Sequence, residues 1–196
     1  MKKGLLIVLS GPSGVGKGTV RKQVFKNTDL NLTYSISMTT RKPREGEVDG
    51  QDYFCVSEER FLEAIENDEL LEHARFVGNY YGTPKAYVEK LREEGKNVFL
   101  EIEVEGAKKV LEDYKDDKGV LSIFLLPPSL YELEKRIRGR RTEPEEIIQQ
   151  RLQKANRELG LKKNYHFNVL NDNINRSSQE IARIIDLKIK ANKYED

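Results

Sequence analysis

One nine-residue stretch, GPSGVGKGT, follows directly on the apolar run LLIVL and limits what this chain can fold into. The stretch contains the pattern G-x-x-x-x-G-K of phosphate-binding loops. The apolar run predicts a strand buried on both faces, and the residues from Gly16 to about Asn27 predict a helix. A glycine loop between such elements turns backbone N–H groups and the positive end of a helix toward an anion. We therefore expect a site for ATP with Mg²⁺, formed by Gly11, Pro12, Ser13, Gly14, Val15, Gly16, Lys17, Gly18 and Thr19.

Gly18 stands where the pattern calls for a serine or threonine that holds magnesium. Switch GTPases and motor ATPases depend on that hydroxyl, so the glycine argues against both classes. The form GKGT, with Thr19 one place later, is instead similar to nucleoside monophosphate kinases of the adenylate kinase sort. We expect Mg²⁺ to be held mainly by ATP and water, with Thr19 and Glu101 contributing through water and no direct protein ligand.

Composition narrows the class of partner. The chain has 34 Lys plus Arg against 33 Asp plus Glu, so anions must be bound by local clusters and we expect no nucleic-acid partner. Cys55 is the one cysteine, which excludes an internal disulfide and fits a reducing cytosol. The N-terminal apolar run is shorter than the roughly 7–15 residues of a signal peptide, and no run approaches the ~20 needed to span a bilayer. We expect a cytoplasmic protein without a membrane partner, and His73 at its surface.

The order of apolar runs predicts an α/β fold. Further strands are expected near 98–102, in GVLSIFLLPP and near 166–171, each followed by a helix. This alternation predicts a parallel sheet with helices on both faces. In the last helix the apolar residues recur with helical spacing: Ile181, Ile184, Ile185 and Ile189.

Two segments interrupt the alternation. Residues 33–84 contain short mixed segments that resemble strands separated by turns. Residues 129–160 are helical and arginine-rich, and Thr142 to Glu145 predict a helix start with a capping box and an early proline. The apolar stripe of that helix is Ile148, Leu152, Ala155 and Leu159. We expect the core to comprise 1–32, 85–128 and 161–196.

The strings SMTTRKPREGEVDGQDYF and LLEHARFVGNYYGTP resemble the guanylate kinase family. The resemblance continues through LEIEVEG, the PPS turn, the GRRT segment and VLND, and so covers nearly the whole chain. It implies a P-loop three-layer sandwich with a parallel core sheet, an inserted mixed-β GMP-binding subdomain at 33–84 and a helical lid at 129–160.

Arg41 and Arg44 lie three apart in a loop with glycine and proline, which suits a clamp on a phosphate. Spacing alone leaves a solvated basic loop as an equal alternative. The resemblance implies that these arginines, with Tyr53 and Tyr81, hold the phosphate of GMP.

The resemblance also assigns the base. It implies that Glu72 accepts the N1–H and N2 donors of guanine, with Ser37 and Thr83 on the remaining base edge. Adenine lacks that donor pair and would leave a buried charge unsatisfied, which gives selectivity. The alternative for Glu72 is an ordinary exposed helix glutamate.

Glu101 and Glu103 stand two apart at the end of the second predicted strand, so they are expected to point to one side. Ligands bind at the carboxyl ends of parallel strands. We expect GMP or water-mediated metal contacts, with Glu101 the better candidate; two solvated glutamates are the alternative. Asn171 and Asp172 match the segment that lines the family's adenine pocket.

The implied reaction is ATP + GMP ⇌ ADP + GDP, extending to dGMP. The attacking phosphate is already largely ionised at neutral pH, so no general base is required. Catalysis then rests on charge neutralisation and in-line positioning. The residues expected to supply it are Lys17, Arg136, Arg140 and Arg151, whereas Arg138 and Arg141 are expected to be solvated.

Two rival functions remain. One is a kinase for another acceptor, AMP or UMP, which Glu72 argues against. The other is a catalytically inactive guanylate-kinase-like module that binds phosphoproteins, which the intact Lys17 and lid arginines argue against. The expected partners are the nucleotides ATP and GMP, and the oligomeric state stays open.

Overall fold

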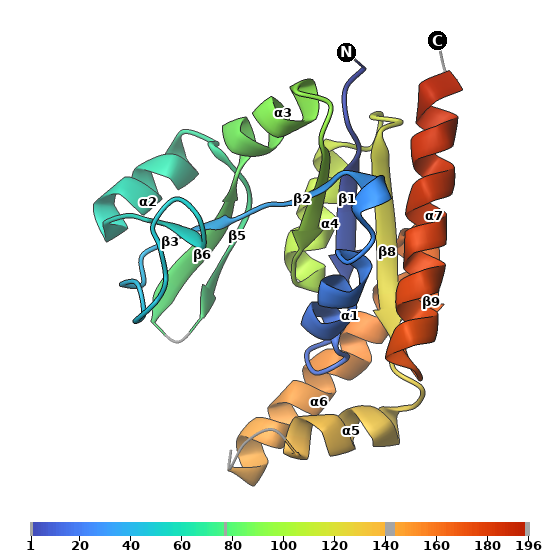
Figure 1. Ribbon diagram of the computed structural model, residues 1–196. Helices are drawn as coiled ribbons and strands as arrows, with labels where there is room; N and C mark the ends of the chain where they lie inside the picture. The colour runs from blue at the N-terminus through green and yellow to red at the C-terminus, as the bar shows by residue number, and fades with distance from the viewer. Residues whose placement is uncertain (1, 77, 140–143, 195–196) are drawn as a thin grey trace.

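The computed structural model describes residues 2–76, 78–139 and 144–194. Its centre is a five-stranded parallel sheet in the order β2-β7-β1-β8-β9 (Figure 1). The strands span Leu6–Ser10 (β1), Leu32–Tyr34 (β2), Asn97–Glu101 (β7), Val120–Leu126 (β8) and Phe167–Leu170 (β9). The three apolar runs beyond the glycine loop are therefore strands, as predicted.

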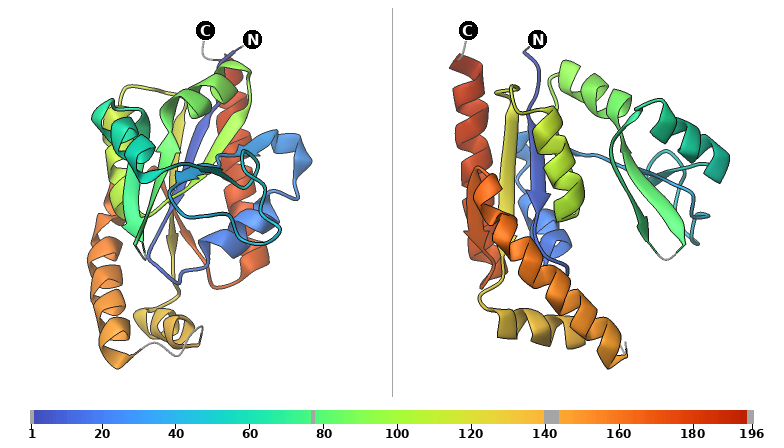
Figure 2. Two further views of the ribbon diagram at one scale, coloured as in Figure 1. Left: turned by 90° about the vertical axis from the view of Figure 1, so that its left-hand side faces the viewer. Right: turned by 180° about the vertical axis from the view of Figure 1, so that it is seen from behind.

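Strand β1 is buried throughout because helices cover both faces of the sheet. Ile7 and Leu9 pack in one cluster with α1 (Lys17–Val24) and α7 (Ile174–Tyr194). Leu6 and Val8 pack in another with α3 (Lys85–Glu93) and α4 (Val104–Asp113). Figure 2 shows α4 on the face turned toward the second sheet and α7 on the opposite face. The predicted three-layer arrangement is confirmed.

A second sheet lies to one side of the core and has the order β4-β3-β6-β5 (Figure 1). Its strands span Ser37–Thr39 (β3), Tyr53–Cys55 (β4), Leu70–Phe76 (β5) and Asn79–Pro84 (β6). Strands β3 and β4 are parallel, whereas β6 runs antiparallel to both β3 and β5. Strand β2, which crosses the expected boundary at residue 33, pairs with β7 in the core sheet.

The prediction for residues 33–84 missed helix α2 (Glu58–Glu66). The Ser57 side chain caps this helix by accepting a hydrogen bond from the Arg60 N–H, and two glutamates occupy its first turn. Phe61 and Ala64 are buried against the second sheet. The sequence SEERFLEAIE contains the capping serine and the acidic first turn of a helix. The segment was nevertheless predicted as strands because tyrosines and glycines surround it.

Helices α5 (Leu130–Arg138) and α6 (Glu145–Leu159) lie at the carboxyl end of β1 (Figure 1). Ile148 and Ala155 are buried, as the predicted stripe requires. Helix α6 begins at Glu145, with Pro144 at the N-cap and no side-chain cap. Thr142 and Glu143 of the expected capping box lie outside the described residues.

Two short 3-10 turns, η1 (Thr28–Leu30) and η2 (Gly160–Asn164), complete the described chain. No helix in the described ranges combines the length and the apolar character needed to cross a membrane.

Candidate active site

The glycine loop between β1 and α1 is held from beneath by Asn171. The Asn171 side chain donates to the Val15 carbonyl oxygen at 2.8 Å and accepts from the Ser177 hydroxyl at 2.9 Å. Gly16 has φ 103°, and a Cβ there would lie 2.8 Å from the Asn171 side-chain nitrogen. Only glycine therefore allows this close approach. Asn171, expected in the ATP site, fixes the loop in this structure and is absent from the described lining of the cleft.

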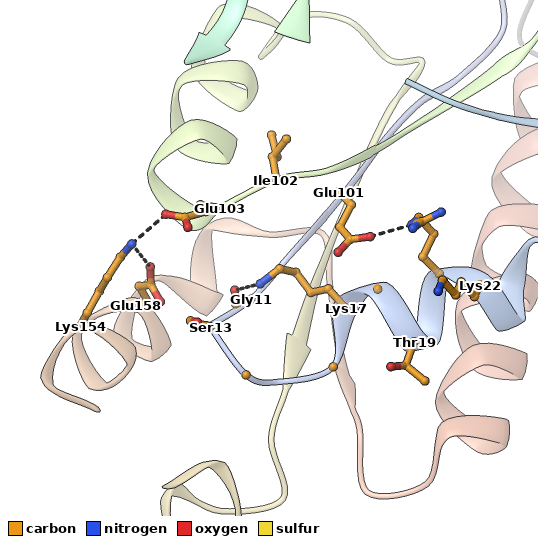
Figure 3. Close-up of a pocket in the computed structure, with 14 residues that line it drawn as sticks. Gly11, Ser13, Lys17, Thr19, Lys22, Glu101, Ile102, Glu103, Lys154 and Glu158 are labelled. Atoms are coloured by element: carbon orange, nitrogen blue, oxygen red, sulfur yellow. Dashed lines mark hydrogen bonds and ion pairs between the residues drawn. The ribbon is translucent and has the colours of Figure 1, made fainter. Parts of the chain in front are cut away.

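The side chain of Lys17 folds back over the loop (Figure 3). Its Nζ donates to the carbonyl oxygens of Gly11 at 2.5 Å and Pro12 at 3.3 Å. Burial lowers the pKa of Lys17, and the carboxylates of Glu101 and Glu103 oppose that shift. The loop thus presents a desolvated cation in an acidic surrounding, so a phosphate can replace its carbonyl partners.

A cleft of about 670 Å³ opens beside the loop. It brings together residues expected to bind ATP, GMP or metal from two parts of the chain: Gly11, Ser13, Gly14, Gly16, Lys17, Gly18, Thr19, Glu101 and Glu103. Arg21, Lys22, Ile102, Lys154 and Glu158 complete its described lining.

Glu101 is held directly above Gly18. Its Oε2 accepts a hydrogen bond of 2.7 Å from Arg21 Nε. A Cβ at Gly18 would lie 3.4 Å from Glu101 Oε1, which is an ordinary van der Waals contact. The position that departs from the loop pattern thus lies directly beside an acidic group from β7.

Glu103 differs from Glu101 in its surroundings. Strand β7 ends at Glu101, and Glu103 is the N-cap residue of α4, so the two-residue alternation of a strand no longer applies. Both nevertheless line the cleft. Glu103 is exposed and forms an ion pair of 2.7 Å with Lys154.

The cleft fits a divalent cation that arrives with a nucleotide. Within the described residues, no three His, Cys, Asp or Glu side chains are grouped so as to hold a metal ion. Glu101 offers one hard oxygen ligand, whereas Thr19 is exposed on the far side of α1 from Glu101 in Figure 3. The donor set supplies part of a coordination shell and leaves the rest to phosphate and water.

Two arginines of α5 and α6 contact the glycine loop in different ways. Arg136 donates to the carbonyl oxygens of Val15 at 3.1 Å and Asn171 at 3.0 Å. Arg151 donates to Ser13 Oγ at 2.9 Å. Both α5 and α6 are therefore tied to the phosphate loop.

Three further arginines lie within residues 138–141, and the structure describes only one of them. Arg138 is exposed and pairs with Glu134 and Glu145 on the surface of α5 and α6. Arg140, expected to be catalytic, and Arg141 lie outside the described residues.

Glu72 occupies a buried position on β5, so the alternative of an exposed helix glutamate is wrong. It is 8% exposed, and its Oε1 accepts a hydrogen bond of 2.5 Å from Thr83 Oγ1 on β6. Burial raises the pKa of this carboxyl, and the Thr83 hydrogen bond only partly offsets that shift. Ser37 on β3 is half-buried, and His73, the residue after Glu72 on β5, is exposed as expected.

The expected phosphate clamp gathers around Arg41. Its guanidinium carbon lies 5.1 Å from the centre of the Tyr53 ring, and Tyr81 also interacts with it. Glu47 accepts two hydrogen bonds of 2.9 Å from Arg41 Nη2 and a third of 2.8 Å from the Arg44 backbone N–H. These contacts lower the pKa of Glu47, the Arg44 N–H most strongly. The side chain of Arg44 itself is exposed.

Sequence reasoning missed five charged residues of these sites: Arg21, Lys22, Glu47, Lys154 and Glu158. Lys154 and Glu158 stand one turn apart on α6 and form an ion pair of 3.7 Å, visible in Figure 3. Glu158 is 5% exposed, its Oε2 has no hydrogen-bond partner within the described chain, and burial raises its pKa. The spacing of charged residues along a helix does not indicate which of them face a cleft. Only Glu47 could have been found from the sequence, because it lies inside the string that resembles the guanylate kinase family.

Comparisons with known proteins agree with this architecture. The guanylate kinase family model matches residues 3–188. A guanylate kinase of Bacillus cereus strain ZK is 56% identical over 94% of this chain and 88% of its own length. One of Mycoplasma capricolum is 55% identical over 96% of this chain, which spans 62% of that longer relative.

A solved guanylate kinase structure from Anaplasma phagocytophilum superposes with a TM-score of 0.72 at 33% identity. The match covers 95% of this chain and 87% of that one. Because the family match and the Bacillus relative each extend over nearly all of the sequence, the chain belongs to the guanylate kinase family.

Proposed function

We propose that the protein transfers the γ-phosphoryl group of ATP to the phosphate of GMP, and of dGMP with it. A GMP phosphate oxygen forms the new bond to the γ-phosphorus, the bond from that phosphorus to the β,γ-bridging oxygen breaks, and ADP leaves. The observation that carries the proposal is the pairing of Lys17 in an intact phosphate loop with a buried Glu72 carboxylate in the second sheet. In this proposal 33–84 binds GMP, 129–160 acts as a lid on the remaining core, and the site of action is the cytoplasm.

Each cationic group has a distinct task in this reaction. Lys17 exchanges its two carbonyl partners for phosphate oxygens and neutralises the charge that builds up between the two nucleotides. Arg151 and Arg136 tie the lid to the loop, so closure of the lid excludes water. We assign Arg140 to the transferring group by resemblance alone. When bound, Mg²⁺ supplies further neutralisation of the phosphates, and Glu101 is the protein group best placed to meet its hydration shell.

The second sheet supplies acceptor recognition. Arg41, Arg44, Tyr53 and Tyr81 hold the GMP phosphate, while Glu72, Thr83 and Ser37 meet the guanine. An ionised Glu72 accepts from both guanine donors, and adenine would leave the buried charge unsatisfied.

The direct test mixes the purified protein with Mg·ATP and GMP, dGMP, AMP or UMP, and follows ADP formation. We expect turnover with GMP and dGMP at least about 100-fold above that with AMP or UMP, since a buried charge left unpaired costs that much in selectivity. Equal rates with AMP would overturn the acceptor assignment. No turnover with any acceptor would favour the inactive phosphoprotein-binding module.

Glu47 provides a separate prediction within the phosphate clamp. The variant Glu47→Gln loses the charge that orients Arg41 and the Arg44 backbone, so KM for GMP should rise about tenfold while kcat changes less. The matched control is Glu45→Gln, an exposed glutamate of the same loop, which should leave KM unchanged. A lower KM for GMP in Glu47→Gln would mean that Glu47 competes with the phosphate instead of orienting the arginine.

A further inference from the structure

Gly106 on α4 lies directly against the side chain of Glu72. A Cβ at Gly106 would stand 2.8 Å from Glu72 Oε2, 3.2 Å from its Cγ and 3.3 Å from its Cβ. A contact of 2.8 Å between a methyl carbon and an oxygen is well inside the van der Waals separation, and the two carbon contacts are also tight. Any other residue at position 106 therefore requires Glu72 to move.

The backbone does not require glycine at this position. Gly106 is the third residue of α4, and its φ is not among the positive values found elsewhere in the described chain. A glycine inside a helix is less favourable than alanine by about 1 kcal/mol. What glycine contributes here is space, and the group that occupies that space is the Glu72 carboxylate.

The contact joins the two sheets of the molecule. Glu72 belongs to β5 of the second sheet, whereas α4 covers the core sheet on the side that faces it (Figure 2). Leu71, the residue before Glu72, packs in the same cluster as Val104 and Ala107 of α4. The N-cap residue of α4, Glu103, lines the ATP-side cleft. The position of Glu72 is therefore set from the core.

The two carboxylate oxygens of Glu72 have different surroundings. Oε1 accepts the hydrogen bond from Thr83 at 2.5 Å. Oε2 is the atom closest to the space above Gly106. A methyl group in that space would push Oε2 away while the Thr83 hydrogen bond retains Oε1. The carboxylate would therefore rotate.

We propose that Gly106 is a positioning residue for acceptor selectivity, whose missing side chain lets the Glu72 carboxylate take the orientation that reads guanine. The inference rests on the proposed role of Glu72 in base recognition. Gly106 touches no substrate, and its effect passes through Glu72 alone.

The test compares Gly106→Ala with Gly160→Ala. Gly160 also has right-handed helical geometry, and a Cβ there would meet nothing within 4 Å, so it is a matched control. We expect Gly106→Ala to raise KM for GMP by about 10- to 100-fold, as for the loss of one hydrogen bond to a charged group. KM for ATP should stay within about twofold, because the change leaves the contacts of the glycine loop untouched. Gly160→Ala should leave both KM values unchanged.

A double-mutant cycle with Glu72→Asp tests whether Gly106→Ala acts on GMP binding through Glu72 or through a general loss of folded structure. Aspartate is one methylene shorter and withdraws the carboxylate from Gly106. Gly106→Ala should therefore weaken calorimetric GMP binding less in the Glu72→Asp background than in the native chain. Additive effects in this cycle would overturn the inference.

The variant Glu72→Gln separates this inference from the proposed function. If Glu72→Gln loses the preference for GMP while Gly106→Ala leaves KM for GMP unchanged, Gly106 has no positioning role and base recognition by Glu72 stands. If Glu72→Gln keeps the preference, the proposed role of Glu72 fails and the inference about Gly106 fails with it.

Discussion

Replacement of Lys17 by methionine is expected to lower kcat by about 10²- to 10³-fold, the usual cost of removing one charge-stabilising donor from a reacting centre. Methionine keeps most of the length and apolar bulk of the lysine stem, so the change isolates the charge. The native ammonium lies 2.5 Å from the Gly11 carbonyl oxygen, on the loop that would hold the phosphates. Its pKa is lowered by burial, yet three nearby carboxylates favour the charged form.

Steady-state ADP formation measures the loss, and calorimetry with ATP separates binding from chemistry. The loop's backbone N–H groups remain in Lys17→Met, so ATP affinity should fall much less than kcat. Lys26→Met, on an exposed lysine just beyond α1, is the control and should retain native kcat. A kcat for Lys17→Met within tenfold of the native value would remove Lys17 from the transfer step.

Replacement of Glu72 by glutamine is expected to lower kcat/KM for GMP by about 100-fold and to abolish most of the preference over AMP. Glutamine presents one acceptor and one donor where guanine offers two donors. The exposed Glu66 on α2 supplies the matched control, and Glu66→Gln should behave as the native protein. Retained selectivity in Glu72→Gln would exclude Glu72 from the base site.

The same variant carries a pH signature. Burial raises the pKa of Glu72 above its ordinary 4.5, so in the native fold the carboxyl binds a proton more readily than in the unfolded chain. Its contribution to stability is therefore fully present below the unfolded pKa and is lost as pH rises through the folded pKa. Glutamine does not ionise and so loses no stability as the pH rises. At neutral pH the thermal unfolding midpoint of Glu72→Gln should therefore be no lower than that of the native protein. Any difference between the two midpoints should decrease at acid pH.

GMP binding should show the opposite dependence, because only the ionised carboxylate accepts from both guanine donors. KM for GMP should rise as pH falls through the raised pKa of Glu72. The GMP phosphate also titrates near ~6, so the comparison with Glu72→Gln isolates the contribution of the residue. If KM for GMP rises at low pH to the same extent in Glu72→Gln, the pH dependence belongs to the GMP phosphate alone.

The strand, loop and helix around Lys17 were predictable because the signals are local. A buried apolar run, glycines able to adopt positive φ and a following helix specify one another within about twenty residues. The carboxyl ends of parallel strands meet at one edge, so the presence of Glu101 near the loop also followed from the order of elements.

The residues proposed to bind the acceptor were identified only through resemblance. Nothing in the spacing of Glu72 and Thr83 reveals that their side chains bond, because β5 and β6 pair through a hairpin whose register shifts near His73. Helix α2 and the contacts of Glu47 were missed for related reasons: a short cap signal lay among strand-forming residues, and a glutamate in a basic loop looks like ordinary surface charge.

The sequence by itself determined the phosphate loop, the alternation of strands and helices and the membership of the chain in its family, since these depend on neighbouring residues and on ordered strings. The tertiary structure alone decided which groups share an environment. It placed Glu101 over Gly18, left Glu158 buried with a free carboxylate oxygen among the described residues, and set Gly106 against Glu72. Those contacts join elements far apart in the chain, and their distances depend on how the two sheets and helices α4, α5 and α6 pack, which no local pattern encodes.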